Sequence, residues 1–144
     1  MNTTLWTRPV TPADINDLHR ETACASLGIE FVEIGPDYMR ATMPVDARTV
    51  QPYRILHGGA SLLLAETLAS CAAAFAAPPD HRVVGLEVNG NHLKSARAGH
   101  VTGTVRPVHV GRSTQVWQVE IVNDAGELCC LSRATLAVLQ PAPD

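Results

Sequence analysis

The chain is 144 residues long, and this length predicts one domain spanning residues 1–144 with a single hydrophobic core. Its composition is 46% hydrophobic and 17% charged, as in globular proteins, which argues against disorder. Eleven basic and 14 acidic residues give a net charge of −3, and Lys and Arg form no basic run. We therefore expect no nucleic-acid partner and no anionic-membrane surface.

The first 12 residues and the cysteines bear on the compartment. Residues 1–12 lack a charged-then-apolar leader with a small-residue cleavage site, so we expect a cytoplasmic protein. We interpret the four cysteines as reduced, mostly core thiols, since none has C-x-x-C spacing; they are Cys24, Cys71, Cys129 and Cys130. No metal is expected, because four of the histidines show no metal-ligand spacing with one another or with the cysteines; they are His19, His81, His100 and His109.

The first part of the chain predicts a helix followed by a hairpin. Thr11-Pro12-Ala13-Asp14 combines an N-cap, a proline at the first helical position and an acid in the first turn, which predicts a short helix to about residue 25. Residues 29–34 and 38–45 have the composition of strands, and Gly35-Pro36-Asp37 between them is a turn signal. Residues 46–56 show no clear period and predict a loop.

Residues 57–77 predict one long helix that is buried on every side. Between residues 59 and 77 there is no Lys, Arg, Asp or Asn, and apolar residues occupy the whole helical wheel. The segment is long enough to cross a bilayer. A core helix is favoured instead, because the segment is mostly alanine, carries Glu66 near its middle and lacks a flanking Lys/Arg bias.

Two features of this helix point to function. A carboxylate without partners is strongly unfavourable in a buried helix, so Glu66 is the first candidate functional residue. His57-Gly58-Gly59 opens the helix with two residues that lack a Cβ, so a ligand oxygen can approach the first N–H groups closely.

Four strands are predicted after the helix, over residues 82–88, 100–110, 113–122 and 128–139. We interpret them as an antiparallel meander. Pro107 predicts an edge, a bulge or a bend within the second of them. The order of elements predicts an α+β fold in which an antiparallel sheet curls around one long central helix, with a short N-terminal helix.

An ordered series of motifs between about residues 40 and 135 carries a family resemblance. The series is Met43-Pro44-Val45-Asp46, Arg48-Thr49, Gln51-Pro52, Leu56-His57-Gly58-Gly59-Ala60-Ser61, Ala65-Glu66-Thr67, Val84-Gly85-Leu86-Glu87-Val88-Asn89, Asn91-His92, Ser95-Ala96-Arg97 and Gln115-Val116-Trp117-Gln118. With these motifs the chain resembles the hot-dog fold acyl-CoA thioesterases, in the branch that contains the phenylacetate-pathway enzymes. Within that branch it is most similar to the 1,4-dihydroxy-2-naphthoyl-CoA and enterobactin-pathway thioesterases.

The resemblance implies hydrolysis of an acyl-CoA, of an aryl type, to the free acid and CoA. A helix N-terminal N–H at Gly58 is suited to stabilise the negative charge that develops on the thioester oxygen. Glu66 would act as nucleophile, giving a mixed anhydride, or as general base on water. Ser70 lies four residues beyond Glu66 on the same helical face and is a candidate for positioning water or the acid.

Further site residues follow from the resemblance. His57 would orient the loop and donate a hydrogen bond, Gln51 would contact the thioester carbonyl, and His92 would line the same pocket. Lys94, Ser95 and Arg97 are candidates for the nucleotide end of CoA, since they form the best local basic patch and CoA carries phosphates. No cofactor is expected beyond CoA, which is part of the substrate.

The resemblance also implies a homodimer whose sites combine the loop and helix start of one subunit with the acid of the other, in a tetramer of two such dimers. The acyl carrier could be CoA or a carrier protein. Two other classes share this fold: a non-catalytic acyl-CoA-binding protein and a hydratase. Glu66 disfavours both, because a sensor needs no buried acid and a hydratase is expected to use an Asp and His pair.

Overall fold

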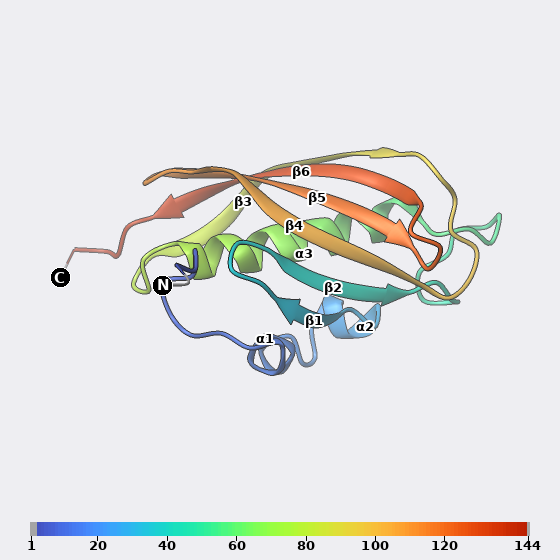
Figure 1. The fold of residues 1–144 in the computed structure, drawn as a ribbon, viewed down its shortest axis with the longest axis horizontal. Helices are drawn as coiled ribbons and strands as arrows, with labels where there is room; N and C mark the ends of the chain where they lie inside the picture. Colours follow the sequence, from blue (N-terminus) through green and yellow to red (C-terminus); the bar gives the residue numbers. More distant parts are fainter. Residues whose placement is uncertain (1–2, 144) are drawn as a thin grey trace.

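The computed structural model describes residues 3–143, in which three helices and six strands form (Figure 1). They are α1 (Pro12–Leu18), α2 (Ala23–Ser26), β1 (Glu30–Ile34), β2 (Met39–Pro44), α3 (Gly58–Ala76), β3 (Arg82–His92), β4 (His100–Val110), β5 (Thr114–Asn123) and β6 (Leu128–Leu139). The strands form one antiparallel sheet in the order β1-β2-β4-β5-β6-β3. The expected hot-dog fold, a sheet around one long helix, is confirmed.

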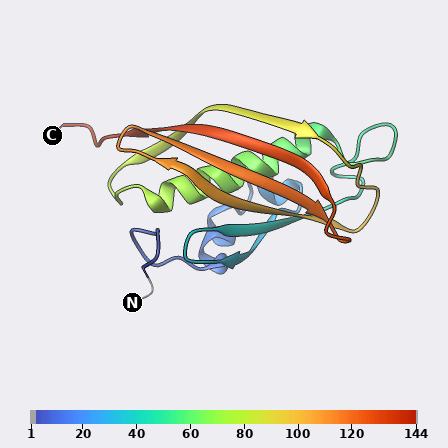
Figure 2. The same ribbon diagram turned by 45° about the horizontal axis from the view of Figure 1, so that its top comes forward.

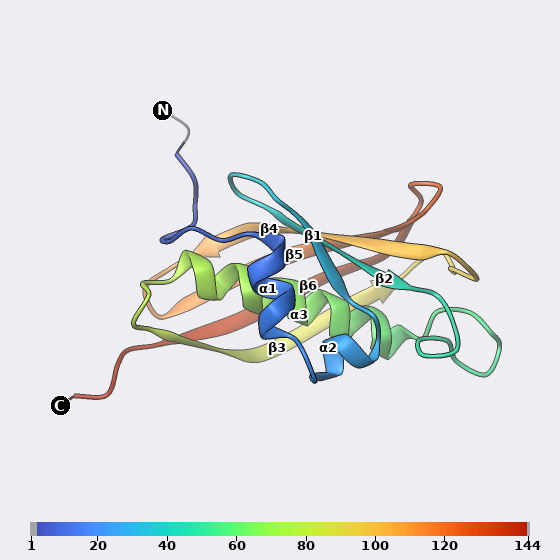
Figure 3. The ribbon, with the colours of Figure 1, turned by 90° about the horizontal axis from the view of Figure 1, so that it is seen from below.

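The molecule is layered around α3. The sheet curves over one side of this helix (Figures 1 and 2), and α1 and α2 lie on the other side (Figure 3). The core forms where α3 meets the inward side chains of the strands, because alternate residues of a strand point to the same face. Fully buried members from the strands are Met39, Ala41, Met43, Val101, Val105, Trp117, Val119, Ile121 and Leu136.

The helix α3 is buried on one face only, so the prediction of burial on every side is wrong for the single chain. Its buried residues are Ala60, Ser61, Leu64, Ala65, Leu68, Ala69, Ala72 and Ala73. Leu62, Leu63 and Phe75 are half-buried, and Glu66 is exposed. The reason is geometric, since one curved sheet covers only one side of a helix. By length and composition α3 could span a membrane, but here it is the core helix of the sheet.

Two glycines let the sheet approach α3 closely. A Cβ atom at Gly103 of β4 would lie 2.5 Å from Cδ1 of Leu68, and one at Gly90 of β3 would lie 2.5 Å from Cδ2 of Leu62. Both distances are far shorter than van der Waals contact, so a larger residue at either position would push the strand away from the helix. The side chains of α3 therefore occupy the space that these strands leave free.

The position of β3 in the sheet differs from the predicted meander. Strands β4, β5 and β6 do follow one another, but β3 pairs with β6 and forms the far edge. The connection over residues 93–99 carries the chain from that edge to β4, next to β2. The strand β3 also runs four residues further than predicted, to His92, because pairing with β6 overrides the weak strand preference of Asn89-Gly90-Asn91.

The N-terminal helix is divided, where one continuous helix was predicted. Thr11 and Asp14 form the capping box that starts α1, but the helix ends at Leu18. Glu21 adopts a positive φ of 55°, which a continuous right-handed helix cannot contain, and α2 begins two residues later. The prediction for Pro107 is confirmed, because the register between β4 and β5 shifts between Pro107 and His109.

Candidate active site

The first turn of α3 offers a free backbone donor. His57 is the N-cap, and its Nδ1 atom accepts a hydrogen bond of 2.8 Å from the N–H of Gly59, which places the proton of a neutral ring on Nε2. The carbonyl of His57 accepts from the N–H groups of Ala60 and Ser61. The N–H of Gly58 has no acceptor among residues 3–143. It is therefore available to a ligand oxygen at the positive end of the helix dipole.

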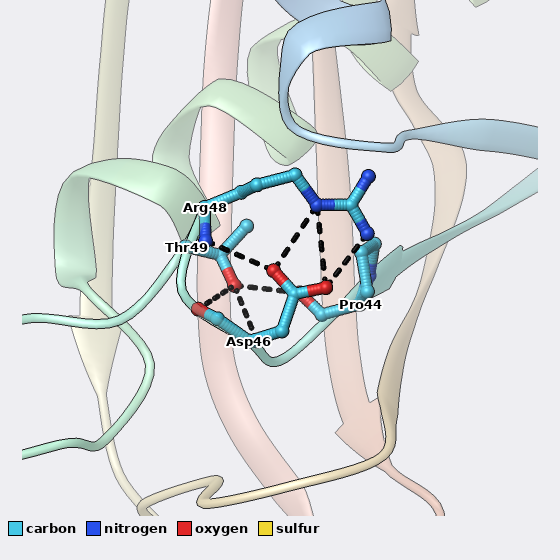
Figure 4. Close-up of polar contacts among 4 residues, drawn as sticks. All are labelled: Pro44, Asp46, Arg48 and Thr49. Carbon is cyan, nitrogen blue, oxygen red and sulfur yellow. Dashed lines mark hydrogen bonds and ion pairs between the residues drawn. The ribbon is translucent and has the colours of Figure 1, made fainter.

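A compact turn before α3 holds this N-cap in place (Figure 4). The buried hydroxyl of Thr49 donates to the carbonyl of Pro44 at 2.6 Å and accepts from the N–H of Asp46 at 3.1 Å. Arg48 forms a two-bond ion pair with Asp46, and these hydrogen bonds hold the pKa of the Asp46 carboxyl below its usual value. The carbonyl of Thr49 then accepts from the N–H of His57 at 2.8 Å. The turn thus sets where the helix begins.

A cavity of about 210 Å³, here called the loop-side cavity, lies beside this helix start. Its polar lining consists of Gln51, Gly58, Ser61, His92, Lys94 and Ser95. The imidazole of His92, at the end of β3, packs against the first residue of α3: a Cβ at Gly58 would lie 2.8 Å from Nε2 of His92. A larger residue at position 58 would therefore have to displace the ring of His92 and would narrow access to the N–H of residue 58.

The amide of Gln51 is held by its own loop. Its Oε1 atom accepts from the N–H of Tyr53, and its backbone carbonyl accepts from the N–H of Arg54, which has a positive φ of 63°. Because the amide oxygen is occupied, the NH2 group of Gln51 remains as a donor toward the loop-side cavity.

A second and larger cavity, about 490 Å³, lies further along α3 and is here called the helix-side cavity. It is lined by Glu66 and Ser70, which share one helical face as their spacing predicts, and by side chains of α1, α2 and the N-terminal segment. The carboxylate of Glu66 also lies against β3, since a Cβ at Gly85 would be 2.9 Å from its Oε1. Glu66 is exposed in the single chain, which corrects the expectation of a buried acid.

The predicted site residues therefore fall into two groups within one chain. Gln51, Gly58, His92, Lys94 and Ser95 line the loop-side cavity, whereas Glu66 and Ser70 line the helix-side cavity. Glu66 lies eight residues after Gly58, which corresponds to about 12 Å along a helix axis. A thioester carbonyl held at Gly58 is thus out of reach of the acid on the same helix. The ring of His57 lines a third hollow, together with Arg48.

The basic patch is partly neutralised. Lys94 forms an ion pair with Glu127, and this hydrogen bond raises the pKa of Lys94 and lowers that of Glu127. Arg97 is exposed and has no ion-pair partner among residues 3–143. Of the two cations, Arg97 is the freer to meet a phosphate.

Sequence reasoning assigned no role to three residues that the structure places at these cavities. Ser61 is only 3% exposed and lines the loop-side cavity, a position its spacing of four from the N-cap His57 could have indicated. Thr49 supports the N-cap, and Arg8 reaches the helix-side cavity from the N-terminal segment. Arg8 has no local signal, because its contact with Ala74 spans 66 residues, whereas the contacts of Thr49 with Asp46 and Pro44 are local. Among residues 3–143, no group of His, Cys, Asp or Glu is arranged to hold a metal.

Comparison with known proteins defines the class. The family model of the thioesterase superfamily matches residues 53–130, and the chain belongs to this superfamily. The 1,4-dihydroxy-2-naphthoyl-CoA hydrolase of Escherichia coli (strain K12) is 47% identical over 135 residues, covering 94% of this chain and 99% of that protein. The proofreading thioesterase EntH of Cronobacter turicensis is 42% identical, covering 94% and 98%.

A solved structure agrees with this assignment. The crystal structure of thioesterase HI1161 from Haemophilus influenzae superposes with a TM-score of 0.95 at 44% identity, covering 97% of this chain and 98% of that chain. The chain is therefore a thioester hydrolase, which sets aside the hydratase and the non-catalytic binding protein as alternatives.

The contribution of the turn shown in Figure 4 to stability can be tested by replacing Thr49. Thr49→Val keeps the shape of the side chain but removes its hydroxyl. The carbonyl of Pro44 and the N–H of Asp46 then lose their hydrogen-bond partner. We expect the free energy of unfolding to fall by about 1–3 kcal/mol, measured by urea denaturation. Thr49→Ser retains the hydroxyl and serves as the control. A loss of stability in Thr49→Ser with none in Thr49→Val would show that the methyl group, not the hydroxyl, holds the turn.

The thiol of Cys71 is a rival nucleophile in the helix-side cavity. Burial raises its pKa to about 12, and the neighbouring Cys24 adds to the shift. At neutral pH it is therefore protonated and a poor nucleophile.

The raised pKa of Cys71 predicts slow alkylation of its thiol in the native protein. Iodoacetamide at pH 8 should alkylate Cys71 on the order of a thousand times more slowly in the native protein than in urea, since each pKa step lowers the thiolate fraction about tenfold. Peptide mass spectrometry measures both rates. Cys71→Ala should also keep normal turnover. Native alkylation as fast as in urea would contradict the raised pKa.

Proposed function

We propose that this protein hydrolyses aryl-CoA thioesters at composite sites, in which Gln51, His57 and Gly58 of one subunit act together with Glu66 and Ser70 of its partner. The observation that carries the proposal is the separation of the two groups by about 12 Å along one helix. Each group is incomplete alone, because one holds the donors for a carbonyl oxygen and the other holds the acid.

The edge strand β3 supports this pairing of subunits. Among residues 3–143 its outer edge has no partner strand, and it exposes Leu86 (64%) and Val84 (40%). Long apolar edges of this kind pair readily with another strand. A two-fold axis between Val88 and Asn89 would set Gly85 of one chain opposite His92 of the other.

That arrangement brings the two half-sites together. Gly85 contacts the carboxylate of Glu66, and His92 contacts Gly58 at the helix start. Pairing β3 with its symmetry mate therefore places the acid of one subunit beside the free N–H of its partner. From the family resemblance we expect two such dimers to form a tetramer. Sedimentation velocity would test this assembly directly.

The chemistry follows from the two half-sites. The Gly58 N–H and the Gln51 amide would donate to the thioester oxygen as it becomes negative, an effect for which one donor is worth about a hundredfold or more in rate. Glu66 would then attack the acyl carbon, expelling the CoA thiolate and leaving an anhydride that water cleaves to regenerate the carboxylate. In the alternative course Glu66 takes a proton from water as the water oxygen attacks the carbonyl; the C–S bond then breaks, and the proton passes from Glu66 to the departing CoA thiolate. Ser70 would orient that water.

The choice of an aryl-CoA substrate rests on the relatives, one of which is a 1,4-dihydroxy-2-naphthoyl-CoA hydrolase. The helix-side cavity, about 490 Å³ and largely apolar in its lining, is of a size to take such a ring. Arg97, Ser95 and Lys94 would meet the phosphates of CoA, which their polar and basic character supports. A cytoplasmic location agrees with the four free cysteines.

Replacing the acid tests the assignment. Glu66→Gln is nearly isosteric and Glu66 lacks a partner within the described part of the chain, so the fold should persist while kcat falls about a hundredfold or more. Steady-state hydrolysis of 1,4-dihydroxy-2-naphthoyl-CoA provides the measurement. Glu120→Gln, an exposed acid on β5, is the matched control and should leave kcat unchanged. Near-normal turnover in Glu66→Gln would remove Glu66 from the mechanism.

A single turnover in ¹⁸O-water separates the two courses. Unlabelled oxygen in the product acid indicates that an oxygen of Glu66 was transferred, as a nucleophile requires when water attacks the Glu66 carbonyl of the anhydride. Fully labelled product indicates general base catalysis, or attack of water at the acyl carbon of the anhydride.

Mixing two inactive variants tests the composite site. His57→Ala and Glu66→Ala are each expected to be nearly inactive, and they are unfolded together and reassembled in equal amounts. Half of the dimers would then be mixed, and each would hold one intact site of two, so about a quarter of wild-type activity should return. If mixed dimers form, as native mass spectrometry would show, and no activity returns, the sites lie within single chains.

A further inference from the structure

Arg8 is fixed at the end of the helix-side cavity furthest from the helix start. The preceding residue, Thr7, donates its backbone N–H to the carbonyl of Phe75 at 2.8 Å and its hydroxyl to the carbonyl of Ala77 at 2.7 Å. The guanidinium of Arg8 lies 4.3 Å above the ring of Phe75 and donates through Nη1 to the carbonyl of Ala74 at 3.2 Å. The N-terminal segment thus holds this cation against the last turns of α3.

The donors of Arg8 are largely unused. A guanidinium has five N–H donors, and one hydrogen bond to Ala74 is made within residues 3–143. No carboxylate of the described chain forms an ion pair with it. Capping the carboxyl end of a helix accounts for one donor, and the half-buried side chain keeps the others for an acceptor that the chain does not supply.

The same cavity holds the acid and the cation at separate places along α3. Glu66 and Ser70 lie near the middle of the helix, and Arg8 contacts Ala74, about 12 Å beyond Glu66 along the axis. Cys71 lies between them on α3, and other apolar side chains, among them Leu18 and Phe75, line the same cavity. An acyl group whose thioester carbon is at Glu66 therefore extends over an apolar surface toward a positively charged, hydrogen-donating end.

We propose that Arg8 is a specificity-determining residue that binds an oxygen substituent on the ring of the acyl group, so that the preferred substrates are hydroxylated aryl thioesters. The proposal rests on the proposed function, since it assumes that the thioester reacts at Glu66. A flat fork of donors beside an aromatic ring suits a phenolic oxygen attached to a flat ring. A site built to donate hydrogen bonds rejects the analogue that lacks the acceptor, because the bound acyl group covers the donors and leaves them unpaired.

The test compares substrates with and without the oxygen. Wild type, Arg8→Met and Arg8→Lys are assayed with 4-hydroxybenzoyl-CoA against benzoyl-CoA, and with 1,4-dihydroxy-2-naphthoyl-CoA against 2-naphthoyl-CoA. We expect Arg8→Met to lower kcat/KM about tenfold to a hundredfold for the hydroxylated member of each pair and less than about twofold for the other. Arg8→Lys should recover part of the preference, since it keeps the charge but not the fork. Arg112→Met, an exposed arginine in the β4–β5 turn, is the control.

Two further measurements make the outcome decisive. Urea denaturation reports whether Arg8 serves only to cap the end of α3. If Arg8→Met loses stability and its kcat/KM changes equally for the hydroxylated and the unsubstituted thioester, the proposal is overturned. Pantetheine thioesters of the same acids lack the nucleotide, so an effect that disappears with them assigns Arg8 to CoA and also overturns it. If wild type hydrolyses none of the thioesters, the proposed function fails. If wild type hydrolyses these thioesters and Arg8→Met changes kcat/KM equally for both members of each pair, only this inference fails.

Discussion

The structure depends on one constraint: α3 is a predominantly apolar helix, and the sheet of one chain covers only one of its sides. Gly90 and Gly103 let the strands close on Leu62 and Leu68, so the covered side is tightly packed. The opposite side keeps Glu66 and several apolar side chains half-buried or exposed. The candidate acid Glu66 and Ser70 lie on the flank that the core does not use.

The helix start and Glu66 lie in different electrostatic environments. The start of α3 offers a free N–H and the positive end of the helix dipole, which suit a developing oxyanion. Glu66, about two turns further on, is exposed in the single chain and forms no ion pair within residues 3–143. A dimer through β3 would bring the two together and at the same time cover the apolar edge.

Small polar networks keep these groups in place. The hydroxyl of Thr49 ties the turn before α3 to the end of β2, and its carbonyl fixes the N–H of His57. At the other end of the helix, Thr7 binds the carbonyls of Phe75 and Ala77 and carries Arg8 to the cavity. The start of α3 is thus held by the loop directly before it, whereas its end is held by a segment about 70 residues earlier in the chain.

The sequence by itself determined the features that local chemistry decides. The capping box of Thr11, the His57 cap of α3 and the acid of that helix all follow from residue types and spacing, because caps and helical faces involve neighbours within a turn or two. Only the tertiary structure decided that β3 joins β6 at the sheet edge, which exposes Glu66 beside Gly85 and aligns His92 with the helix start. Strand pairing is chosen by packing across long stretches of chain, and no local pattern encodes it.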